Sequence, residues 1–331
     1  MTSVKKKVRA LGLCSGGLDS ILAALLLRQQ AIGVEWVTFE TPFFSSDKAR
    51  RAAELTGVRL RVRKIFDPYL EMLKNPNCGY GQYMNPCMDC HALMFRLAAD
   101  IMGLEGFNFL FSGEVLGQRP MSQTRSSLRY VEKHSGADGY ILRPLSARRL
   151  PETLPEQQGL VDRQQLLDIS GRSRKRQIQL AALWGVDEYP APAGGCLLTD
   201  KGYTRRLKDL FDHQPDVTEN ELHLLKYGRH FRLKDGTKVI VGRTQGDNEK
   251  IQHYADASCD TLLKVESHPG PLVLVSPGES DGGRFMAACL CVGYSKAPGD
   301  TPIRVGVTSP RGRLTLTVIG IAPGDVRHLM I

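Results

Sequence analysis

The chain has 331 residues, of which 42% are hydrophobic and 24% are charged. This length and composition are typical of a globular protein with about two domains, and they exclude a disordered or collagen-like chain. No apolar run approaches the ~18 residues that a membrane span requires, so the sequence also excludes an integral membrane protein. The basic N-terminus leads into an apolar run that is too short for a signal peptide, and we therefore expect a cytoplasmic protein.

Charge and cysteine content narrow the class of partner and of chemistry. The 44 Lys and Arg residues exceed the 35 Asp and Glu residues, which gives a net charge of +9 and favours an anionic partner such as nucleic acid. Eight cysteines in a chain of this length are too few for a disulfide scaffold. In a reducing compartment, a cluster of cysteines instead predicts metal or redox chemistry.

The first 200 residues alternate short apolar runs with helical patterns. Strands are expected at VRALGLC, VEWVTFE and RLRVRKI, and helices at ILAALLL and at 45–56. Strands that alternate with helices of about ten residues build a parallel sheet with helices on both faces. The sequence therefore predicts an α/β domain with a doubly wound parallel sheet, whose ligands bind at the carboxyl ends of the strands.

A loop rich in Asn, Pro, Gly and Cys interrupts this alternation at 75–87. A helix is expected over 89–102, then the buried strand NFLFSGE, and later the basic helix RSRKRQIQLAALWG. The segment YPAPAGGC cannot continue a helix, and we place the end of the first domain near Asp200. The expected domains are therefore 1–200 and 201–331.

Residues 201–331 predict a smaller α+β domain. Helices are expected at KGYTRRLKDLF and ELHLLKYG, followed by a hairpin, FRLKDGTKVIVGR, that turns on Asp235-Gly236. Further strand-like runs are TLLKV, PLVLV, IRVGV and RLTLTVIG.

The most specific motif is SGGLDS, which spans Ser15 to Ser20 between a predicted strand and a predicted helix. Gly16 and Gly17 allow a turn in which backbone N–H groups and the helix N-terminus converge on an anion. Asp19 would repel a bare phosphate, but it fits a site in which Mg²⁺ bridges the carboxylate to pyrophosphate. An ordinary strand-to-helix turn is the alternative interpretation.

This motif resembles the PP-loop of ATP pyrophosphatases, which cleave ATP to AMP and pyrophosphate. The segments FSGEVLGQRPMSQTRSSL and YILRPL are similar to conserved segments of the tRNA 4-thiouridine synthase family. The resemblance implies a PP-loop domain of the adenine nucleotide alpha hydrolase-like fold. It also implies ATP, Mg²⁺ and tRNA as cofactor and partners of this chain.

The resemblance further implies which residues bind ATP. Five of the PP-loop residues would hold the triphosphate with Mg²⁺, and a second group after the later strand would contact the nucleotide. His91 falls where the family carries a basic ATP contact, and a neutral histidine weakens that assignment. The expected ATP-binding residues are Ser15, Gly16, Gly17, Asp19, Ser20, His91, Gly113, Gln118 and Gln123.

Three cysteines are the candidate sulfur-handling residues. Cys87 and Cys90 have the C-x-x-C spacing of a metal site, and Cys196 follows a Pro/Gly loop that could return to the carboxyl edge of the sheet. Three cysteines without an evident fourth fit a 4Fe–4S cluster with one open iron better than a closed zinc site. The NPCxxC element is similar to that of 2-thiouridylases, which pair it with a later cysteine.

Alternatives to the cluster remain open at these cysteines. The family's PEYCG cysteine aligns with Gln158, which excludes a persulfide relay through that position. A persulfide on one of the three cysteines, a zinc knuckle or inert thiols would each fit the same spacing. Cys78 could add a fourth ligand, whereas Cys14 and Cys259 have no partner at ligand spacing. Cys289 and Cys291 lie in a pattern typical of a core.

Basic side chains form two candidate RNA-binding groups. The first surrounds the inferred active site, although a solvated helix face would give the same charge pattern. The second lies in 226–250, which resembles the NFACT-R RNA-binding module. The expected RNA contacts are Arg148, Arg149, Arg172, Arg174, Lys175 and Arg176 in the first group and Arg229, Arg232 and Arg243 in the second.

The sequence thus predicts an ATP-dependent tRNA sulfurtransferase that adenylates a uridine carbonyl and replaces its oxygen with sulfur. Asp19, Cys87, Cys90 and Cys196 are the expected catalytic residues, and hydrosulfide or a cysteine desulfurase is the expected sulfur donor. A PP-loop amidating ligase and a non-catalytic RNA-binding quality-control factor are the two alternatives. The uridine position, the choice between O2 and O4, and the oligomeric state remain open.

Overall fold

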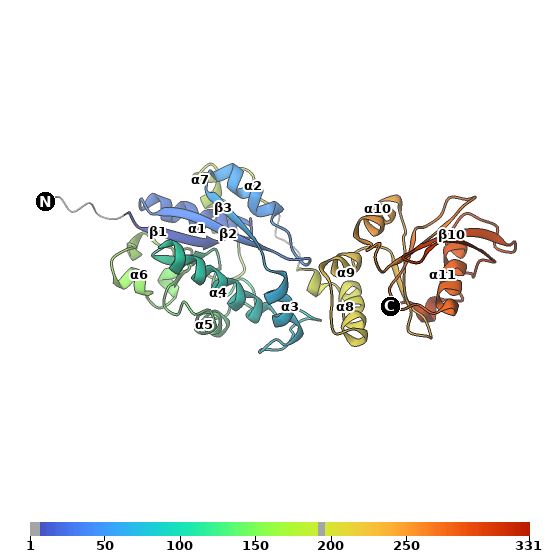
Figure 1. Cartoon of the computed structure of the whole chain (residues 1–331). Coiled ribbons are helices and arrows are strands. Elements are labelled where there is room, and N and C mark those ends of the chain that lie inside the picture. Colours follow the sequence, from blue (N-terminus) through green and yellow to red (C-terminus); the bar gives the residue numbers. More distant parts are fainter. Residues whose placement is uncertain (1–6, 191–195) are drawn as a thin grey trace. The chain divides into compact units, whose positions relative to one another are not determined.

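The computed structural model describes residues 7–190 and 196–331, and the chain divides into two compact units, Met1–Thr199 and Asp200–Ile331 (Figure 1). The basic start of the chain and the Pro/Gly loop expected before Cys196 fall largely outside the described residues. Within the described residues, no helix combines the length and the apolar character needed to cross a membrane.

The first unit is built on a parallel five-stranded sheet with the order β3-β2-β1-β4-β5. This confirms the predicted α/β class with a parallel sheet. The strands are β1 (Arg9–Leu13), β2 (Gly33–Glu40), β3 (Arg59–Lys64), β4 (Phe109–Ser112) and β5 (Ile141–Leu142).

Helices cover both faces of this sheet. Helices α2 and α7 lie on one face and α4 and α5 on the other (Figure 1). The helices of the unit are α1 (Leu18–Gln29), α2 (Asp47–Thr56), α3 (Phe66–Lys74), α4 (Cys87–Glu105), α5 (Arg125–His134), α6 (Leu154–Gln157) and α7 (Lys175–Leu183). Short 3₁₀ turns are η1 (Ala147–Arg149), η2 (Arg163–Gln165) and η3 (Leu197–Thr199).

The core of the first unit sits around β1 and α1. Leu18, Ile21, Leu22 and Leu27 of α1 are fully buried, because this helix packs against the sheet and against α7. The chain runs from β1 outward to β3 and then returns to β4 on the other side of β1. The loops after β1 and β4 therefore diverge, and they open the crevice in which doubly wound sheets bind ligands.

Helix α4 begins earlier than the sequence predicted. It starts at Cys87 rather than near Asp89 and continues to Glu105, with Pro86 as its N-cap. A proline just before a helix is tolerated because the first N–H groups of a helix have no intrahelical partner. Cys87 and Cys90 therefore lie three residues apart in the first turn of a helix, on one face of it.

The second unit is an antiparallel six-stranded sheet, order β11-β10-β8-β9-β7-β6, packed against α11. This confirms the predicted C-terminal α+β domain. Its strands are β6 (Arg229–Arg232), β7 (Lys238–Val241), β8 (Thr261–Val265), β9 (Val273–Val275), β10 (Ile303–Ser309) and β11 (Gly312–Val318). Its helices are α8 (Lys201–His213), α9 (Glu219–Leu224), α10 (Gln245–Tyr254) and α11 (Asp281–Gly293), with the 3₁₀ turn η4 (Arg327–Leu329).

The hairpin β6–β7 differs from the expected two-residue turn. Leu233 N donates to Thr237 O at 2.9 Å, and Gly236 N donates to Leu233 O at 3.0 Å. The loop therefore has three residues, and Gly236 closes it with a positive φ of 88°. A three-residue loop with a left-handed glycine at its last position is a common hairpin connection, so Asp235-Gly236 marks the turn but is not its centre.

Candidate functional site

The loop Ser15–Gly17 connects β1 to α1 at the carboxyl edge of the first sheet. Gly16 has a φ of 72°, and a Cβ there would lie 2.2 Å from the backbone carbon of Lys48. The loop can therefore pass close to the start of α2 only with glycine at this position. The Oγ atoms of Ser15 and Ser20 lie 3.1 Å apart, and Gly17 N donates to Ser15 Oγ at 3.4 Å. Helix α1 begins at Leu18 with Gly17 as its N-cap, so its first N–H groups lie at this turn without intrahelical partners, as in helix N-termini that bind anions.

Asp19 lies in the first turn of α1 and has one satisfied and one unsatisfied oxygen. Its Oδ2 accepts a hydrogen bond from Gln118 Nε2 at 2.7 Å. Its Oδ1 is buried and has no hydrogen-bond partner among the described residues. Burial raises the pKa of Asp19, and the hydrogen bond from Gln118 and the positive charges of Arg174 and Arg119 only partly offset this rise. A buried carboxylate oxygen without a partner fits a Mg²⁺ ligand, because the ion would supply the missing positive charge.

Gly113 and Gln123 lie near the same loop but differ in what they contact. A Cβ on Gly113 would lie 2.4 Å from the backbone carbon of Asp19. Glycine at this position therefore allows the end of β4 to pack against the backbone at the start of α1. Gln123 is 7% exposed, and its Oε1 is buried without a partner among the described residues. It remains a candidate nucleotide contact, since a buried amide of this kind is available to a ligand.

His91 is engaged by a buried carboxylate. Its Nδ1 lies 2.9 Å from Glu114 Oε1, while Arg143 Nε donates to the other oxygen of Glu114 at 2.9 Å. Glu114 is the second residue after β4, so this cluster lies at the carboxyl edge beside Gly113. The contact leaves only Nε2 of His91 for a nucleotide.

The three candidate cysteines come together at the start of α4. The thiols of Cys87 and Cys196 both act electrostatically on Cys90. The hydroxyl of Tyr69, a side chain that is 1% exposed, donates a hydrogen bond to Cys90. Cys196 Sγ donates to Asn85 Oδ1 at 3.9 Å. Cys196 thus lies beside the C-x-x-C pair, although it is more than a hundred residues away in the sequence.

Burial favours the protonated form of the Cys90 and Cys196 thiols. Burial, aided by the charges of the Cys196 and Cys87 thiols, outweighs the hydrogen bond from Tyr69 and raises the pKa of Cys90 to about 12. Burial also raises the pKa of Cys196. Among residues 7–190 and 196–331, no group of three or more His, Cys, Asp and Glu side chains is arranged to hold a metal ion. The donor set has the right chemistry for a cluster, but the described side chains do not form a ready-made metal centre.

Cys78 contacts Asp89 and Tyr130. Its backbone N–H donates to Asp89 Oδ2 at 2.8 Å, and Tyr130 donates to Asp89 Oδ1 at 2.9 Å. The Cys78 side chain interacts with the hydroxyl of Tyr130. Cys289 and Cys291 are buried in α11, as the sequence pattern predicted, and Cys14 is buried beside the PP-loop.

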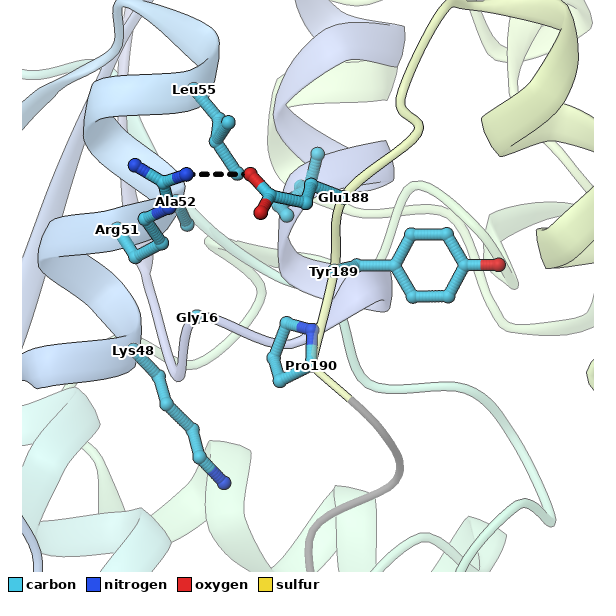
Figure 2. A pocket seen from close by; sticks show the side chains of 9 residues that line it. Gly16, Lys48, Arg51, Ala52, Leu55, Glu188, Tyr189 and Pro190 are labelled. Atoms are coloured by element: carbon cyan, nitrogen blue, oxygen red, sulfur yellow. Dashed lines mark hydrogen bonds and ion pairs between the residues drawn. The ribbon is translucent and has the colours of Figure 1, made fainter.

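A pocket of about 240 Å³ lies beside Gly16, between α2 and the segment that follows α7 (Figure 2). Arg51 of α2 and Glu188 of that segment form an ion pair of 2.6 Å across it. Figure 2 shows Lys48 and Pro190 on the side of the pocket nearer to Gly16. The pocket therefore lies next to the turn in which the phosphates are expected.

The predicted basic side chains of the first unit form one surface, with one exception. Arg176 and Arg149 both contact Asp168, at 2.9 and 3.9 Å, so the two sequence segments are neighbours. Arg148, Arg172 and Lys175 are exposed near them. Arg174 is the exception, since it is half-buried and its charge acts on Asp19.

The three predicted arginines of the second unit have different surroundings. Arg229 lies over the ring of Tyr294, with its guanidinium carbon 4.9 Å from the ring centre. Arg232 forms an ion pair with Asp209 at 2.6 Å and also donates to the carbonyl of Gly236 at 2.7 Å. Arg243 pairs with Asp247 at 2.8 Å, and its side chain is 44% exposed. Arg229 and Arg243 thus keep more freedom than Arg232 to reach a phosphate.

Sequence reasoning missed several residues that shape the site. Gln177 is fully buried, and its Nε2 donates to Gln118 Oε1 at 2.9 Å. Tyr69, Glu114 and Arg119 also belong to the site and carried no signal of their own. A buried glutamine, tyrosine or glutamate within an element of ordinary pattern has no signature in a single sequence.

The parallel sheet, the glycine turn and the orphaned aspartate define the first unit as a PP-loop domain. Residues 5–149 match the model of the thiamine biosynthesis protein (ThiI) family, and residues 228–329 match that of the NFACT protein RNA binding domain. The chain therefore carries a PP-loop domain of the ThiI type, which makes it an ATP-using enzyme, followed by an RNA-binding domain of the NFACT type.

Solved structures resemble parts of the chain at low identity. One is the C-terminal part of the fibronectin/fibrinogen-binding protein of Streptococcus suis, with 16% identity over 48% of this chain and 79% of that chain, at a TM-score of 0.28. A predicted subunit of a tRNA methyltransferase from Methanocaldococcus jannaschii has 16% identity over 53% of this chain and 76% of that chain, at a TM-score of 0.35. NMN synthetase of Francisella tularensis has 14% identity over 67% of this chain and 84% of that chain, at a TM-score of 0.34. At these TM-scores the likeness bears on neither activity nor partners.

Proposed function

We propose that the protein is an ATP-dependent tRNA sulfurtransferase. The observation that carries this proposal is the meeting of Cys87, Cys90 and Cys196 at the sheet edge that also bears the PP-loop. His91 follows Cys90 and contacts Glu114 at the end of β4, and Gly113 beside it packs on Asp19. Amidation needs no such thiols, because ammonia is itself the nucleophile.

The first half of the reaction is adenylation. The carbonyl oxygen of a uridine attacks the α-phosphate of ATP, and pyrophosphate leaves. The N–H groups of the PP-loop and of the start of α1 hold the phosphates. Asp19 Oδ1 would hold Mg²⁺, which supplies charge neutralisation for the leaving pyrophosphate. The Gln118 hydrogen bond fixes Asp19 in the rotamer that presents this oxygen.

The second half is substitution of the activated oxygen. A sulfur nucleophile attacks the adenylated carbon of the base, and AMP leaves with the original carbonyl oxygen. If the nucleophile is a cysteine persulfide, a second thiol of the trio attacks the cysteine sulfur, and the thiolated base is released. A disulfide then remains in the protein, and a thiol reductant must reduce it to regenerate the two thiols. A hydrosulfide nucleophile leaves no disulfide.

The carrier of the sulfur is the finer part of the proposal. A 4Fe–4S cluster on the three cysteines would supply a site for hydrosulfide, and a persulfide would need no metal. Analysis of iron and acid-labile sulfide in protein purified without oxygen distinguishes the cluster from the persulfide. About four iron atoms per chain in the wild type, and their loss in Cys196→Ser, would support the cluster. Protein free of iron that still thiolates tRNA contradicts it.

The test of the function follows pyrophosphate release and sulfur incorporation into tRNA separately, with ATP and sulfide present. We expect Asp19→Asn to lose both activities. Cys196→Ser should keep pyrophosphate release and lose at least ~100-fold of the sulfur incorporation, since it removes a group that acts only in the second half. Cys259→Ser changes an exposed cysteine of the second unit and should leave both activities intact. Pyrophosphate release without any need for tRNA would contradict the proposal and favour a ligase for a small acid.

A further inference from the structure

Tyr83 carries an exposed aromatic ring on a left-handed backbone. Its φ is 58°, and the residue is 46% exposed. In the part of the chain that the structure describes, two residues other than glycine have a positive φ, Tyr83 and Ala31. Ala31 directly follows the C-cap of α1, where helices commonly end in this conformation. Tyr83 ends no helix, and strain at a bulky residue persists mainly where function requires it.

The loop that carries Tyr83 is closed next to Cys196. Gly81 N donates to Asn85 O at 2.9 Å, which leaves Tyr83 at the tip of a five-residue turn. The side chain of Asn85 accepts a hydrogen bond from Cys196 Sγ at 3.9 Å. The residue that closes the turn is therefore also the residue that contacts one of the three thiols.

The start of the same loop is bound to the C-x-x-C segment. Asp89, which lies between the two cysteines of that segment, is 5% exposed. Its Oδ2 accepts a hydrogen bond from Cys78 N at 2.8 Å, and its Oδ1 accepts one from the hydroxyl of Tyr130 at 2.9 Å. Both ends of the loop 78–85 are thus fixed to residues of the thiol site, and Tyr83 stands at the rim of that site.

A second tyrosine of this loop has a structural role. Tyr80 is 41% exposed, and its hydroxyl donates to Leu73 O at 2.6 Å, which ties the loop to the end of α3. Burial does not account for Tyr83 in this way, because nearly half of it is exposed on a strained backbone. The exposed ring at the rim is therefore available to a ligand of the thiol site.

The proposed function requires a base that has left its stack. Enzymes that carry out chemistry on a nucleobase extrude it from the helix, and the extruded base is held by stacking on aromatic or apolar side chains. Such a ring must be exposed beside the reacting groups. Tyr83 meets this condition, whereas Tyr69, at 1% exposure, does not.

We infer that the ring of Tyr83 stacks on an extruded uridine base of the bound tRNA and holds it at the thiol site. The inference rests on the proposed function and deepens it by naming a side chain that touches the substrate base. The closed turn fixes the ring before tRNA binds, so less conformational entropy is lost when the base arrives.

A tryptophan in place of Tyr83 tests the stacking without turnover, because a nucleobase stacked on an indole ring quenches its fluorescence. We expect tRNA to quench the emission that Tyr83→Trp adds to that of the wild type. Tyr80→Trp is the matched control, since it places an indole in the same loop at a position of similar exposure and should not be quenched. Binding of tRNA to Tyr83→Trp without quenching would overturn the inference.

The kinetics of sulfur incorporation test whether the ring or the hydroxyl is needed. Tyr83→Ala should raise the KM for tRNA at least ~5-fold, which is at the low end of the effect of losing one base–aromatic stack. Tyr83→Phe keeps the ring and should stay within about twofold of the wild type. Equal losses in the two variants would assign the effect to the hydroxyl and overturn the inference.

A glycine at the same position separates the ring from the backbone conformation. Tyr83→Gly should unfold at a higher urea concentration than Tyr83→Ala, because glycine adopts a positive φ without strain, yet its KM for tRNA should be no lower. Recovery of the wild-type KM in Tyr83→Gly would overturn the inference. Ala31→Gly, the control for relief of strain, should keep the wild-type KM. A wild type that incorporates no sulfur would instead contradict the proposed function, whereas an unquenched Tyr83→Trp contradicts the stacking alone.

Discussion

Glu114 shows how a single buried carboxylate organises the edge of the first sheet. The side chains of Glu114 and Arg143 are 8% and 2% exposed, and Ser112 Oγ donates to Glu114 Oε2 at 3.1 Å. Burial alone would raise the pKa of Glu114, but the charge of Arg143 and the contact with His91 outweigh it and hold the pKa at about 2. The ionised form is thus the one that the fold stabilises.

This depressed pKa predicts how Glu114 contributes to stability. Because the folded pKa lies below the ordinary carboxyl value of 4.5, the contribution is complete above that value and is lost as the pH falls toward 2. Glu114→Gln removes one of the two charge partners of buried Arg143, the other being Glu132 at 2.5 Å, and should lower the free energy of unfolding by about 3 kcal/mol at pH 7. The difference in the free energy of unfolding between the variant and the wild type should shrink by about 2 kcal/mol as the pH falls from 6 to 3. Urea unfolding across this range measures both values.

Glu54→Gln is the control for that experiment. Glu54 pairs with Arg51 at 3.4 Å, but its side chain is 68% exposed. An exposed pair contributes at most about 1 kcal/mol, so this variant should unfold like wild type at every pH. A pH-independent deficit in Glu114→Gln would mean that the variant lost packing rather than the charge interaction.

At the scale of elements, the contact between the PP-loop and α2 depends on one glycine. Gly16 and Gly57, which ends α2, both have positive φ, at 72° and 64°. A Cβ on Gly16 would lie 2.2 Å from the Lys48 backbone, whereas a Cβ on Gly57 would meet nothing within 4 Å. Alanine substitution at Gly57 therefore measures the cost of a left-handed conformation alone, and substitution at Gly16 adds the cost of a steric clash.

We expect Gly57→Ala to lower the free energy of unfolding by about 1 kcal/mol, which is the cost of alanine in a left-handed conformation. Gly16→Ala should cost about 2 kcal/mol more, because the loop must move away from α2. It should also abolish binding of the Mg²⁺ complex of α,β-methylene-ATP, which Gly57→Ala should retain. Urea unfolding and calorimetry check the two effects. Equal behaviour of the two variants would contradict a role for close packing at Gly16.

The elements themselves were largely predictable, and their contacts were not. The periodic pattern predicted the helix that became α7, because apolar residues recur within it. The bond between Gln177 and Gln118 joins residues 59 positions apart, and no local pattern encodes such a contact. The start of α4 was misplaced because the Pro86 loop and the first helical turn share the same polar residues. The C-x-x-C spacing nevertheless predicted the meeting of the first two cysteines.

At the scale of the whole chain, the two sheets followed from the sequence because their patterns differ. Continuous apolar runs separated by helices indicated the buried parallel strands of the first unit. Alternating runs such as IRVGV indicated the antiparallel strands of the second, and β10 alternates buried and exposed residues accordingly. Which edge of each sheet gathers the functional residues depends on strand order, and a single sequence predicts strand order only through its crossovers.

Positive charge is distributed unevenly between the two units. Residues 1–199 contain 26 basic and 19 acidic residues, a net charge of +7, while residues 200–331 contain 18 and 16, a net charge of +2. The PP-loop unit therefore carries most of the excess positive charge, and we expect it to supply more of the electrostatic attraction for RNA than the NFACT-type domain. Five basic residues of the surface near the active site are exposed, and two of them, Arg149 and Arg176, pair with Asp168. The other three are Arg148, Arg172 and Lys175, which we call the basic surface.

This distribution predicts the salt dependence of tRNA binding. Replacement of all three residues of the basic surface by Gln should weaken tRNA binding and reduce the slope of log K against log salt by about 2, since each lost phosphate contact lowers it by roughly 0.7–0.9. Arg59→Gln, Arg96→Gln and Lys133→Gln together remove the same charge from exposed positions of the same unit. If phosphate contacts are local to the basic surface, this second variant should keep the wild-type slope, because counterions are released only where phosphates bind. Filter binding at several salt concentrations measures the slopes. Equal reductions in both variants would mean that net charge, rather than the basic surface, attracts the RNA.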